Sequence, residues 1–341
     1  NYPFCTIEPN SAIVEVADPR LEALAKIVAP QQIIRATVEF TDIAGLVKGA
    51  SKGEGLGNKF LANIRECDAI LHVVRCFEND DIIHVQEGGN KSAPIDPAGD
   101  AEVIETELVL ADMEQLQKRC DKTRNEAKSD PKKRPEFDAM TALLAHLGEG
   151  KPVRTFPRAE GDPILPVLRD LHFLTDKKTI YCANVAEDDL ADPSANPHVA
   201  ALKAYADAQG CEMVTVCAQM EADLAGLSDA EAKEFLSSYG LTSSSLDRTI
   251  KLAYHTLGLA SFLTAGPKEV RAWTFRRGWK APQCAGVIHT DFEKGFIRAQ
   301  VIAFDDYVKH NGDARAAGAL RPEGKDYEMQ DGDVVEFMFN K

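Results

Sequence analysis

Short, nearly uninterrupted apolar runs constrain the fold of this 341-residue chain more than any other feature of its sequence. Three of them, AILHVV, TIYCA and MVTVC, have the composition of strands that are covered on both faces, and ATVEFT is a fourth β-rich run. Segments with helical spacing, such as residues 56–67 and 197–208, lie between the runs. Strands that alternate with helices predict a mostly parallel α/β sheet. The runs occupy residues 36–41, 69–74, 179–183 and 213–217.

Two later regions break this alternation. Residues 101–120 and 137–147 carry apolar side chains at helical spacing, with Pro131 and Pro135 between them, which predicts an α-helical hairpin inserted between two strands of the sheet. From about residue 264, strand-like runs recur at short spacing and are separated by Gly and Asp turns, which predicts a small β-rich module. These last runs are residues 270–275, 286–289, 297–303 and 334–339.

Composition excludes several classes of protein. With 44% hydrophobic and 27% charged residues the chain is of ordinary globular type, and it lacks the run of about 18 apolar residues that a membrane span needs. The eight cysteines form no CxxC pair, so we expect buried thiols in the reducing cytoplasm rather than a zinc site or disulfides. The net charge of −15 argues against nucleic-acid binding by the whole surface, although residues 118–134 hold eight basic and three acidic side chains.

Polar and small residues follow three of the predicted strands. Ligands bind at the carboxyl ends of strands in an open parallel sheet, so these positions are candidate site residues. A carboxylate at Asp42 can hold Mg²⁺, and the backbone N–H of Gly45 can meet a terminal phosphate; the alternative is that Asp42 caps the next segment. The other two strand ends read Asn184-Val185-Ala186-Glu187 and Cys217-Ala218-Gln219.

A phosphate-binding loop is the feature that this sequence does not show. Residues 53–59 (GEGLGNK) resemble one, but a Walker A sequence needs Lys directly after the last Gly and Ser or Thr after the Lys. Here Asn58 precedes Lys59 and Phe60 follows it. Since the chain opens on Asn1 without Met, we expect N-terminal residues to be missing.

Five motifs of this sequence are long and specific. They are residues 1–10 (NYPFCTIEPN), 42–60 (DIAGLVKGASKGEGLGNKF), 75–85 (RCFENDDIIHV), 184–187 (NVAE) and 290–299 (TDFEKGFIRA). They resemble the Obg-like ATPases, the YchF family of P-loop NTPases. The resemblance implies an α/β G domain at residues 1–95 and 161–263, a helical insertion at 96–160, and a C-terminal TGS domain with a β-grasp-like fold at 264–341. It also implies a Walker A loop upstream of Asn1, so we expect the given chain to bind nucleotide weakly and to be inactive by itself.

The resemblance assigns roles to residues of the phosphate site. Thr6 matches the switch I threonine and Asp42 the Walker B carboxylate, which implies that both face Mg²⁺, while Gly45 matches the switch II glycine. Leu46 stands where most GTPases place a glutamine that orients water, and a leucine side chain cannot do so by hydrogen bonding. The family implies that a histidine acts instead, and His84 matches it; without the resemblance His84 is a loop residue.

The base-recognition motif predicts which nucleotide binds. Most G proteins use N-K-x-D, whose aspartate pairs with guanine, whereas this chain has Asn184, Val185 and Glu187. The longer side chain of Glu187 moves the carboxylate by one methylene, and Val185 replaces the lysine that packs along the base. We therefore expect ATP to be preferred over GTP, as the family implies. The main base contacts would be Asn184 and Val185, with Cys217, Ala218 and Gln219 in the loop beneath.

The predicted C-terminal module opens with cations that alternate with Trp273, Phe275 and Trp279. Cations can contact phosphates while exposed rings stack on unpaired bases; the alternative is that the rings face the core and the cations are a solvated rim. Ribosome association in the family favours RNA, and the basic turn at residues 118–134 is a second candidate contact. The five cations are Lys268, Arg271, Arg276, Arg277 and Lys280.

Two functions follow from these observations. The first is a cytoplasmic, Mg²⁺-dependent ATPase with weak GTPase activity, whose nucleotide state regulates its association with the ribosome or the translation machinery. The second is a ribosome- or RNA-binding regulator that uses the nucleotide as a structural ligand, which the presence of Leu46 keeps open. We expect a monomeric protein that does not bind membranes.

Overall fold

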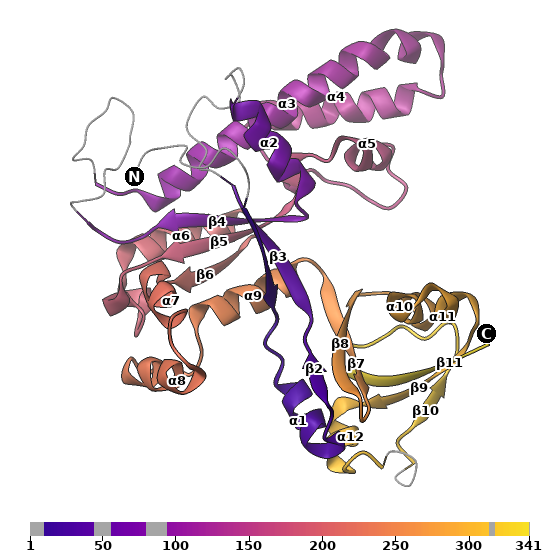
Figure 1. Cartoon of the computed structure of the whole chain (residues 1–341). Coiled ribbons are helices and arrows are strands. Elements are labelled where there is room, and N and C mark those ends of the chain that lie inside the picture. Colours follow the sequence, from indigo (N-terminus) through magenta and orange to yellow (C-terminus); the bar gives the residue numbers. More distant parts are fainter. Residues whose placement is uncertain (1–9, 44–55, 80–93, 314–317, 341) are drawn as a thin grey trace. The chain divides into compact units, whose positions relative to one another are not determined.

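A computed structural model describes residues 10–43, 56–79, 94–313 and 318–340 of the chain. The chain divides into two compact units (Figure 1). The first unit comprises Asn1–Asn10 and Thr41–Arg248, and the second comprises Ser11–Phe40 and Thr249–Lys341.

A parallel sheet forms the centre of the first unit. Its strands lie in the order β4-β5-β6, and their register pairs Val73 with Cys182 and Cys182 with Val214. The central strand is almost wholly buried, with Tyr181 fully covered, as the apolar composition of the run predicts. The prediction of a parallel sheet built from these three runs is confirmed. The strands are β4 (Ala69–Arg75), β5 (Lys178–Asn184) and β6 (Glu212–Val216).

Helices and short 3₁₀ turns connect and cover these strands. The predicted helices at residues 56–67 and 197–208 are confirmed as α2 and α6. The helices are α2 (Leu56–Glu66), α3 (Pro97–Ser129), α4 (Arg134–Gly148), α5 (Ile164–Leu171), α6 (Pro197–Ala208), α7 (Ala218–Leu224), α8 (Asp229–Ser238) and α9 (Ser245–Thr256), the last of which has residues in both units. The 3₁₀ turns are η2 (Val153–Thr155), η3 (Leu174–Asp176), η4 (Glu187–Asp189) and η5 (Pro193–Ala195).

Helices α3 and α4 lie side by side (Figure 1). In the sequence they come between β4 and β5. Helix α3 begins at a capping residue, Asp96, whose side chain accepts a hydrogen bond from the N–H of Gly99 at 3.1 Å. It ends just before Pro131, which cannot continue a helix. Leu116 of α3 and Met140 and Leu143 of α4 are fully buried in one apolar cluster, so the two helices hold each other in place.

A mixed six-stranded sheet dominates the second unit, in the order β10-β9-β11-β7-β8-β2. Strands β7 and β8 pair antiparallel, whereas β2 pairs parallel with β8, with Ile33 opposite Val270. The six strands of this sheet are β2 (Gln32–Ile34), β7 (Leu259–Ala265), β8 (Glu269–Arg276), β9 (Phe296–Ala303), β10 (Arg321–Glu323) and β11 (Asp333–Phe339). Two further strands, β1 (Asn10–Glu15) and β3 (Thr37–Asp42), form a separate sheet of two. The helices are α1 (Pro19–Val28), α10 (Ala281–Ile288), α11 (Thr290–Lys294) and α12 (Phe304–Lys309).

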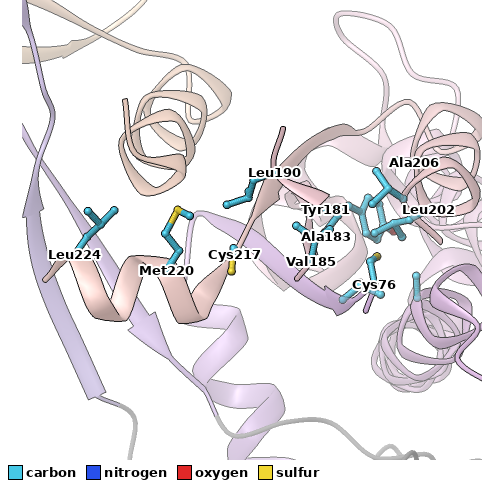
Figure 2. Close-up of a cluster of buried hydrophobic side chains, with 13 residues drawn as sticks. Cys76, Tyr181, Ala183, Val185, Leu190, Leu202, Ala206, Cys217, Met220 and Leu224 are labelled. Atoms are coloured by element: carbon cyan, nitrogen blue, oxygen red, sulfur yellow. The ribbon is translucent and has the colours of Figure 1, made fainter. Parts of the chain in front are cut away.

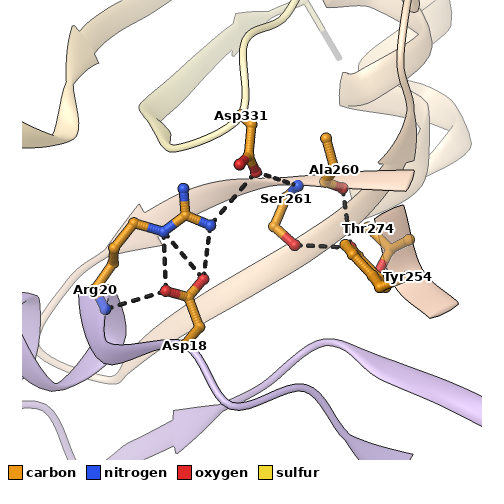
Figure 3. A network of polar contacts seen from close by, with 7 residues as sticks. All are labelled: Asp18, Arg20, Tyr254, Ala260, Ser261, Thr274 and Asp331. Carbon is orange, nitrogen blue, oxygen red and sulfur yellow. Dashed lines mark hydrogen bonds and ion pairs between the residues drawn. The ribbon is translucent and has the colours of Figure 1, made fainter. Parts of the chain in front are cut away.

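Polar contacts tie α1 to the sheet of the second unit (Figure 3). Asp18, which caps α1, accepts hydrogen bonds from the guanidinium of Arg20 at 2.8–3.1 Å, and this raises the pKa of Arg20. Arg20 also reaches Asp331 at 3.4 Å, and Asp331 accepts a bond from the N–H of Ser261 in β7 at 3.0 Å. The start of α1 is therefore fixed to the middle of the sheet.

Two predicted strands differ in the structure. The run at residues 36–41 is a strand, β3, and among the described residues its partner is β1, in a sheet of two. Its Val38 is buried in a cluster with Leu21 and Leu263 of the second unit. The prediction of a strand at residues 286–289 is wrong, because these residues form the end of helix α10. This helix buries Ala281, Cys284 and Ala285 at helical spacing.

The compact units also differ from the expected domain boundaries. Strand β7, which begins at Leu259, lies in the same sheet as β8 to β11, whereas the C-terminal domain was expected to begin at residue 264. Residues 11–40, expected in the G domain, cluster with the second unit. No helix among the described ranges is both long enough and apolar enough to cross a membrane.

Candidate functional site

The carboxyl ends of β4, β5 and β6 stop level with one another. Beyond the strands, the N–H of Cys76 donates to the carbonyl of Asn184 at 2.8 Å, and the N–H of Val185 donates to the carbonyl of Val216 at 2.9 Å. These two bonds extend the ladder by one residue and bring the segments that follow the strands together. The predicted site residues Asn184–Glu187 and Cys217–Gln219 therefore lie at one edge of the sheet.

The side chain of Asn184 joins two of these segments. Its Oδ1 accepts a hydrogen bond from the N–H of Ala218 at 3.0 Å, at the first residue of α7. This bond fixes the orientation of the carboxamide, and the amide nitrogen is left without a partner among the residues that the structure describes. An N–H donor held in this way suits a ring nitrogen of a purine, which accepts hydrogen bonds.

Val185 and Cys217 contribute their backbone to this edge, because both side chains are 2% exposed. Figure 2 shows them within the apolar cluster that also contains Leu190 and Met220. Burial raises the pKa of the Cys217 thiol, which stays neutral. The expected contact between Val185 and a base can therefore involve only its main chain.

Glu187 has a partner that the sequence does not indicate. It opens the short turn η4, and its Oε2 accepts a hydrogen bond from the hydroxyl of Tyr239 at 3.1 Å. The carboxylate in turn raises the pKa of the Tyr239 phenol. The two residues are 52 positions apart, and no motif or periodicity links them.

Asn196 is a second residue that the motifs missed. Its Nδ2 donates to the carbonyl of Cys76 and to Oδ2 of Asp189, both at 2.9 Å, while its Oδ1 accepts from the N–H of His198 at 2.8 Å. The residue is 8% exposed and joins the end of β4 to η4 and to the start of α6. An asparagine directly before Pro197 is a common helix cap, so the sequence held a signal for it.

Four predicted residues of the phosphate site, Thr6, Gly45, Leu46 and His84, lie outside the described residues. Asp42 ends β3 with an exposed side chain. Within the described ranges there is no group of three or more His, Cys, Asp and Glu side chains that could hold a metal ion. Of the two predicted magnesium ligands, Asp42 is therefore the one that lies within the described residues.

The predicted RNA-contacting residues lie on and next to β8. Phe275 is 2% exposed and packs in the core, so it cannot stack on a base. Trp273 donates from its indole nitrogen to Thr264 at 3.0 Å, and the Arg271 guanidinium lies 3.7 Å from the centre of its ring. Lys280 pairs with Asp326 at 2.9 Å. Of the three rings, only Phe275 faces the core, whereas Trp273 and Trp279 are half-buried. The other exposed cations of this surface are Lys268, Arg276 and Arg277.

Comparison with known proteins identifies the family. A family model described as a 50S ribosome-binding GTPase matches residues 1–107, and the YchF-GTPase C-terminal model, described as a protein of unknown function (DUF933), matches residues 259–340. A protein of Haemophilus ducreyi named ribosome-binding ATPase YchF is 50% identical over 343 residues, which span all of this chain and 92% of the relative. The chain belongs to the YchF family.

Other members of the YchF family are similar to this chain over nearly its whole length. The proteins of the same name from Bacillus subtilis and Escherichia coli O157:H7 are each 49% identical over all of this chain and 92% of their own length. The structure of the Schizosaccharomyces pombe YchF GTPase matches 99% of this chain and 90% of its own, with a TM-score of 0.85 and 34% identity. A GTP-binding protein of Pyrococcus horikoshii OT3, at 19% identity and a TM-score of 0.57, shares the fold. The predicted P-loop GTPase fold and YchF membership are confirmed.

Proposed function

We propose that this protein is a Mg²⁺-dependent ATPase that prefers ATP to GTP and whose nucleotide state regulates its association with the ribosome. The observation that carries the proposal is the Asn184 side chain, which is held by the N–H of Ala218 at the ends of the parallel strands. The relatives support it, because they are named ribosome-binding ATPases and a GTPase family model matches the chain.

The proposed preference for ATP rests on the residues that follow Asn184. Guanine needs an acceptor for its N1–H and its 2-amino group, which an aspartate supplies in the N-K-x-D motif. Here the carboxylate belongs to Glu187 and is bonded to Tyr239, and the Val185 side chain is buried and cannot pack along a base. The donors of guanine would therefore find no acceptor here, and a nucleotide with unpaired polar groups binds more weakly than one whose groups are paired.

The proposed chemistry is attack of water on the γ-phosphate, which yields ADP and phosphate. Asp42, with Thr6, would hold Mg²⁺ through side-chain oxygens, which this ion prefers, and Gly45 would donate its N–H to the phosphate. Mg²⁺ would neutralise developing charge on the phosphate oxygens. We assign the orientation of water to His84, because Leu46 cannot do it by hydrogen bonding.

Single-turnover hydrolysis of ATP and of GTP by the full-length protein tests this function. We expect ATP to be cleaved faster, and His84→Ala to slow cleavage by roughly 10²-fold or more, as loss of a positioned proton-transfer group does. Cys67→Ser, a substitution at a half-buried thiol outside the proposed site, is the control. If His84→Ala cleaves ATP at the rate of the control, the role of His84 is wrong.

The alternative function, a ribosome-binding regulator with nucleotide as a structural ligand, predicts a different result. Both variants would then bind ATP and ribosomes normally, and neither would release phosphate above the background rate. Because the 341-residue sequence holds no Walker A motif, we also expect this chain to bind labelled ATP weakly. Micromolar affinity in a titration of that chain would contradict this expectation.

We propose that the parts of the structure correspond to the domains expected from the sequence. The first unit would be the G domain, with α3 and α4 as its helical insertion, and the C-terminal sheet would be the TGS domain. We assign ribosomal RNA contacts to the cations beside β8 and to the basic residues at 118–134, which span the end of α3, the turn after it and the start of α4. Such contacts would place the protein in the cytoplasm. We also propose that it acts there as a monomer.

A further inference from the structure

Tyr239 occupies a fixed position next to the base-recognition motif. It follows the last residue of α8, and its ring lies 5.3 Å, between centroids, from the ring of Phe235 on the same helix. Both rings pack against the apolar cluster that contains Val185 and Cys217. Because the ring is held on one side by this cluster, its hydroxyl meets Glu187 from a defined direction.

Glu187 is equally constrained on its own segment. The N–H of Leu190 donates to the carbonyl of Glu187 at 3.1 Å, and the N–H of Asp189 donates to the carbonyl of Ala186 at 3.2 Å, so the backbone forms a closed turn. Val185 and Leu190, which flank the turn, are 2% and 5% exposed. The main freedom left to Glu187 is therefore the rotation of its side chain, and the bond from Tyr239 removes much of it.

The chemistry of the two purines makes this orientation matter. At the edge of the ring, guanine presents two donors, N1–H and the 2-amino group, whereas adenine presents its 6-amino donor beside an acceptor, N1. A free carboxylate accepts from both guanine donors and repels the lone pair of adenine N1. A carboxylate whose oxygen is held by a phenol is less available for that pairing.

We propose that Tyr239 is a positioning residue that holds the Glu187 carboxylate against α8 and thereby makes the site select adenine over guanine. This inference rests on the proposed nucleotide-binding function and adds a specificity-determining residue to it. The extra methylene of Glu187 lets the carboxylate reach Tyr239, and Tyr239 keeps it there. Tyr239 itself makes no contact with the base.

The test compares ATP and GTP affinities of variants of the full-length protein. Tyr239→Phe keeps the ring and removes the hydroxyl, so Glu187 becomes free to pair with guanine. We expect GTP to bind about tenfold more tightly while ATP changes by about twofold or less, since a hydrogen bond to a charged group is at stake. Tyr239→Phe combined with Glu187→Gln should lose this gain, because an amide offers one acceptor and one donor where guanine needs two acceptors.

Tyr205→Phe is the matched control. Tyr205 packs partly buried against the same apolar cluster, and its hydroxyl is not bonded to Glu187. This variant should leave the ratio of ATP to GTP affinity unchanged. If Tyr239→Phe also leaves the ratio unchanged, or weakens both nucleotides equally, Tyr239 is only a packing residue and the proposal is overturned.

A second measurement does not depend on nucleotide. The Glu187 carboxylate raises the pKa of Tyr239, so an ultraviolet difference titration between wild type and Tyr239→Phe should show a phenol that ionises late. Glu187→Gln should return that pKa towards its ordinary value, and no change would show that the contact is absent. If wild type prefers GTP, the proposed function fails, but a shift in the affinity ratio on Tyr239→Phe still supports the positioning role.

Discussion

Asp112 is a buried carboxylate that holds the start of the central strand. It lies on α3 with 0% exposure, and its oxygens accept hydrogen bonds from the N–H groups of Leu174 and Thr175 at 2.9 and 2.8 Å and from the Thr175 hydroxyl at 2.7 Å. Arg65 lies 4.0 Å away. Burial nevertheless outweighs these contacts and raises the pKa of Asp112 from 3.8 to about 6.

The raised pKa gives stability a definite dependence on pH. The folded state binds the proton of Asp112 more tightly than the unfolded chain does, so its contribution to stability is fully present below pH 3.8. That contribution is lost as the pH rises from 3.8 to about 6, and it is absent at neutral pH. A change of roughly two pKa units corresponds to about 3 kcal/mol in the free energy of unfolding.

Asp112→Asn isolates this effect, because the amide keeps the size of the side chain and does not titrate. Wild type and variant are unfolded with urea at several pH values, and the difference in unfolding free energy between them is followed. Relative to the variant, wild type should lose about 3 kcal/mol between pH 4 and pH 7. The carbon NMR signal of the Asp112 carboxyl should titrate near pH 6.

The reasoning fails if the carboxyl of Asp112 titrates near its ordinary pKa, or if the difference between the two proteins stays constant or rises with pH. Asp138→Asn is the control. Asp138 is an exposed carboxylate on α4 that lies 3.6 Å from Arg134, and its removal should leave the pH dependence in this window nearly unchanged.

Three further predictions concern the same unit. The buried carboxylate of Glu105 lies 2.6 Å from the guanidinium of Arg154. Arg154→Met removes this partner, so the free energy of unfolding measured with urea should fall by about 3–5 kcal/mol. The double variant Arg154→Met with Glu105→Gln should recover most of this loss. Asn184→Ala should weaken ATP binding by about tenfold or more in a fluorescence titration, measured well below the melting temperature of the variant; equal affinity would remove Asn184 from the site. Four lysines of the α3–α4 hairpin have no ion pair among the described residues, and we replace them together by glutamine. The slope of log affinity for the ribosome against log salt concentration should then become shallower by about three to four. An unchanged slope would show that the hairpin does not contact ribosomal RNA. These lysines are Lys122, Lys128, Lys132 and Lys133.

Much of the candidate site was predictable because its positions depend on local sequence. The runs at residues 69–74, 179–183 and 213–217 have the composition and length of strands and alternate with helical segments, and parallel strands bring their carboxyl ends to one edge. The NVAE and Cys217–Gln219 motifs follow directly, so their meeting was foreseeable. Helices α3 and α4 were foreseeable from their 3.6-residue periodicity and the prolines between them.

Other features depend on which surfaces meet, and no local pattern records that. Residues 36–41 have a strand composition, yet the partner of β3 is β1, because a strand can pair with any free edge. Residues 286–289 are apolar enough for a strand, but Pro282 at the start of α10 and a core that accepts Ala281 and Cys284 select a helix. Short apolar runs are ambiguous between these two outcomes.

The sequence by itself determined the buried strands, the helical pair and the position of the base-recognition motif, because composition and periodicity act over a few neighbouring residues. Only the tertiary structure decided the environment of each side chain at that motif: the burial of Val185, the hydrogen bond from Asn196 to the carbonyl of Cys76, and the hydrogen bond from Tyr239 to Glu187. Such contacts join residues far apart in the chain, and they form only when the packing of α8 and the turn after β5 brings two side chains within about 3 Å.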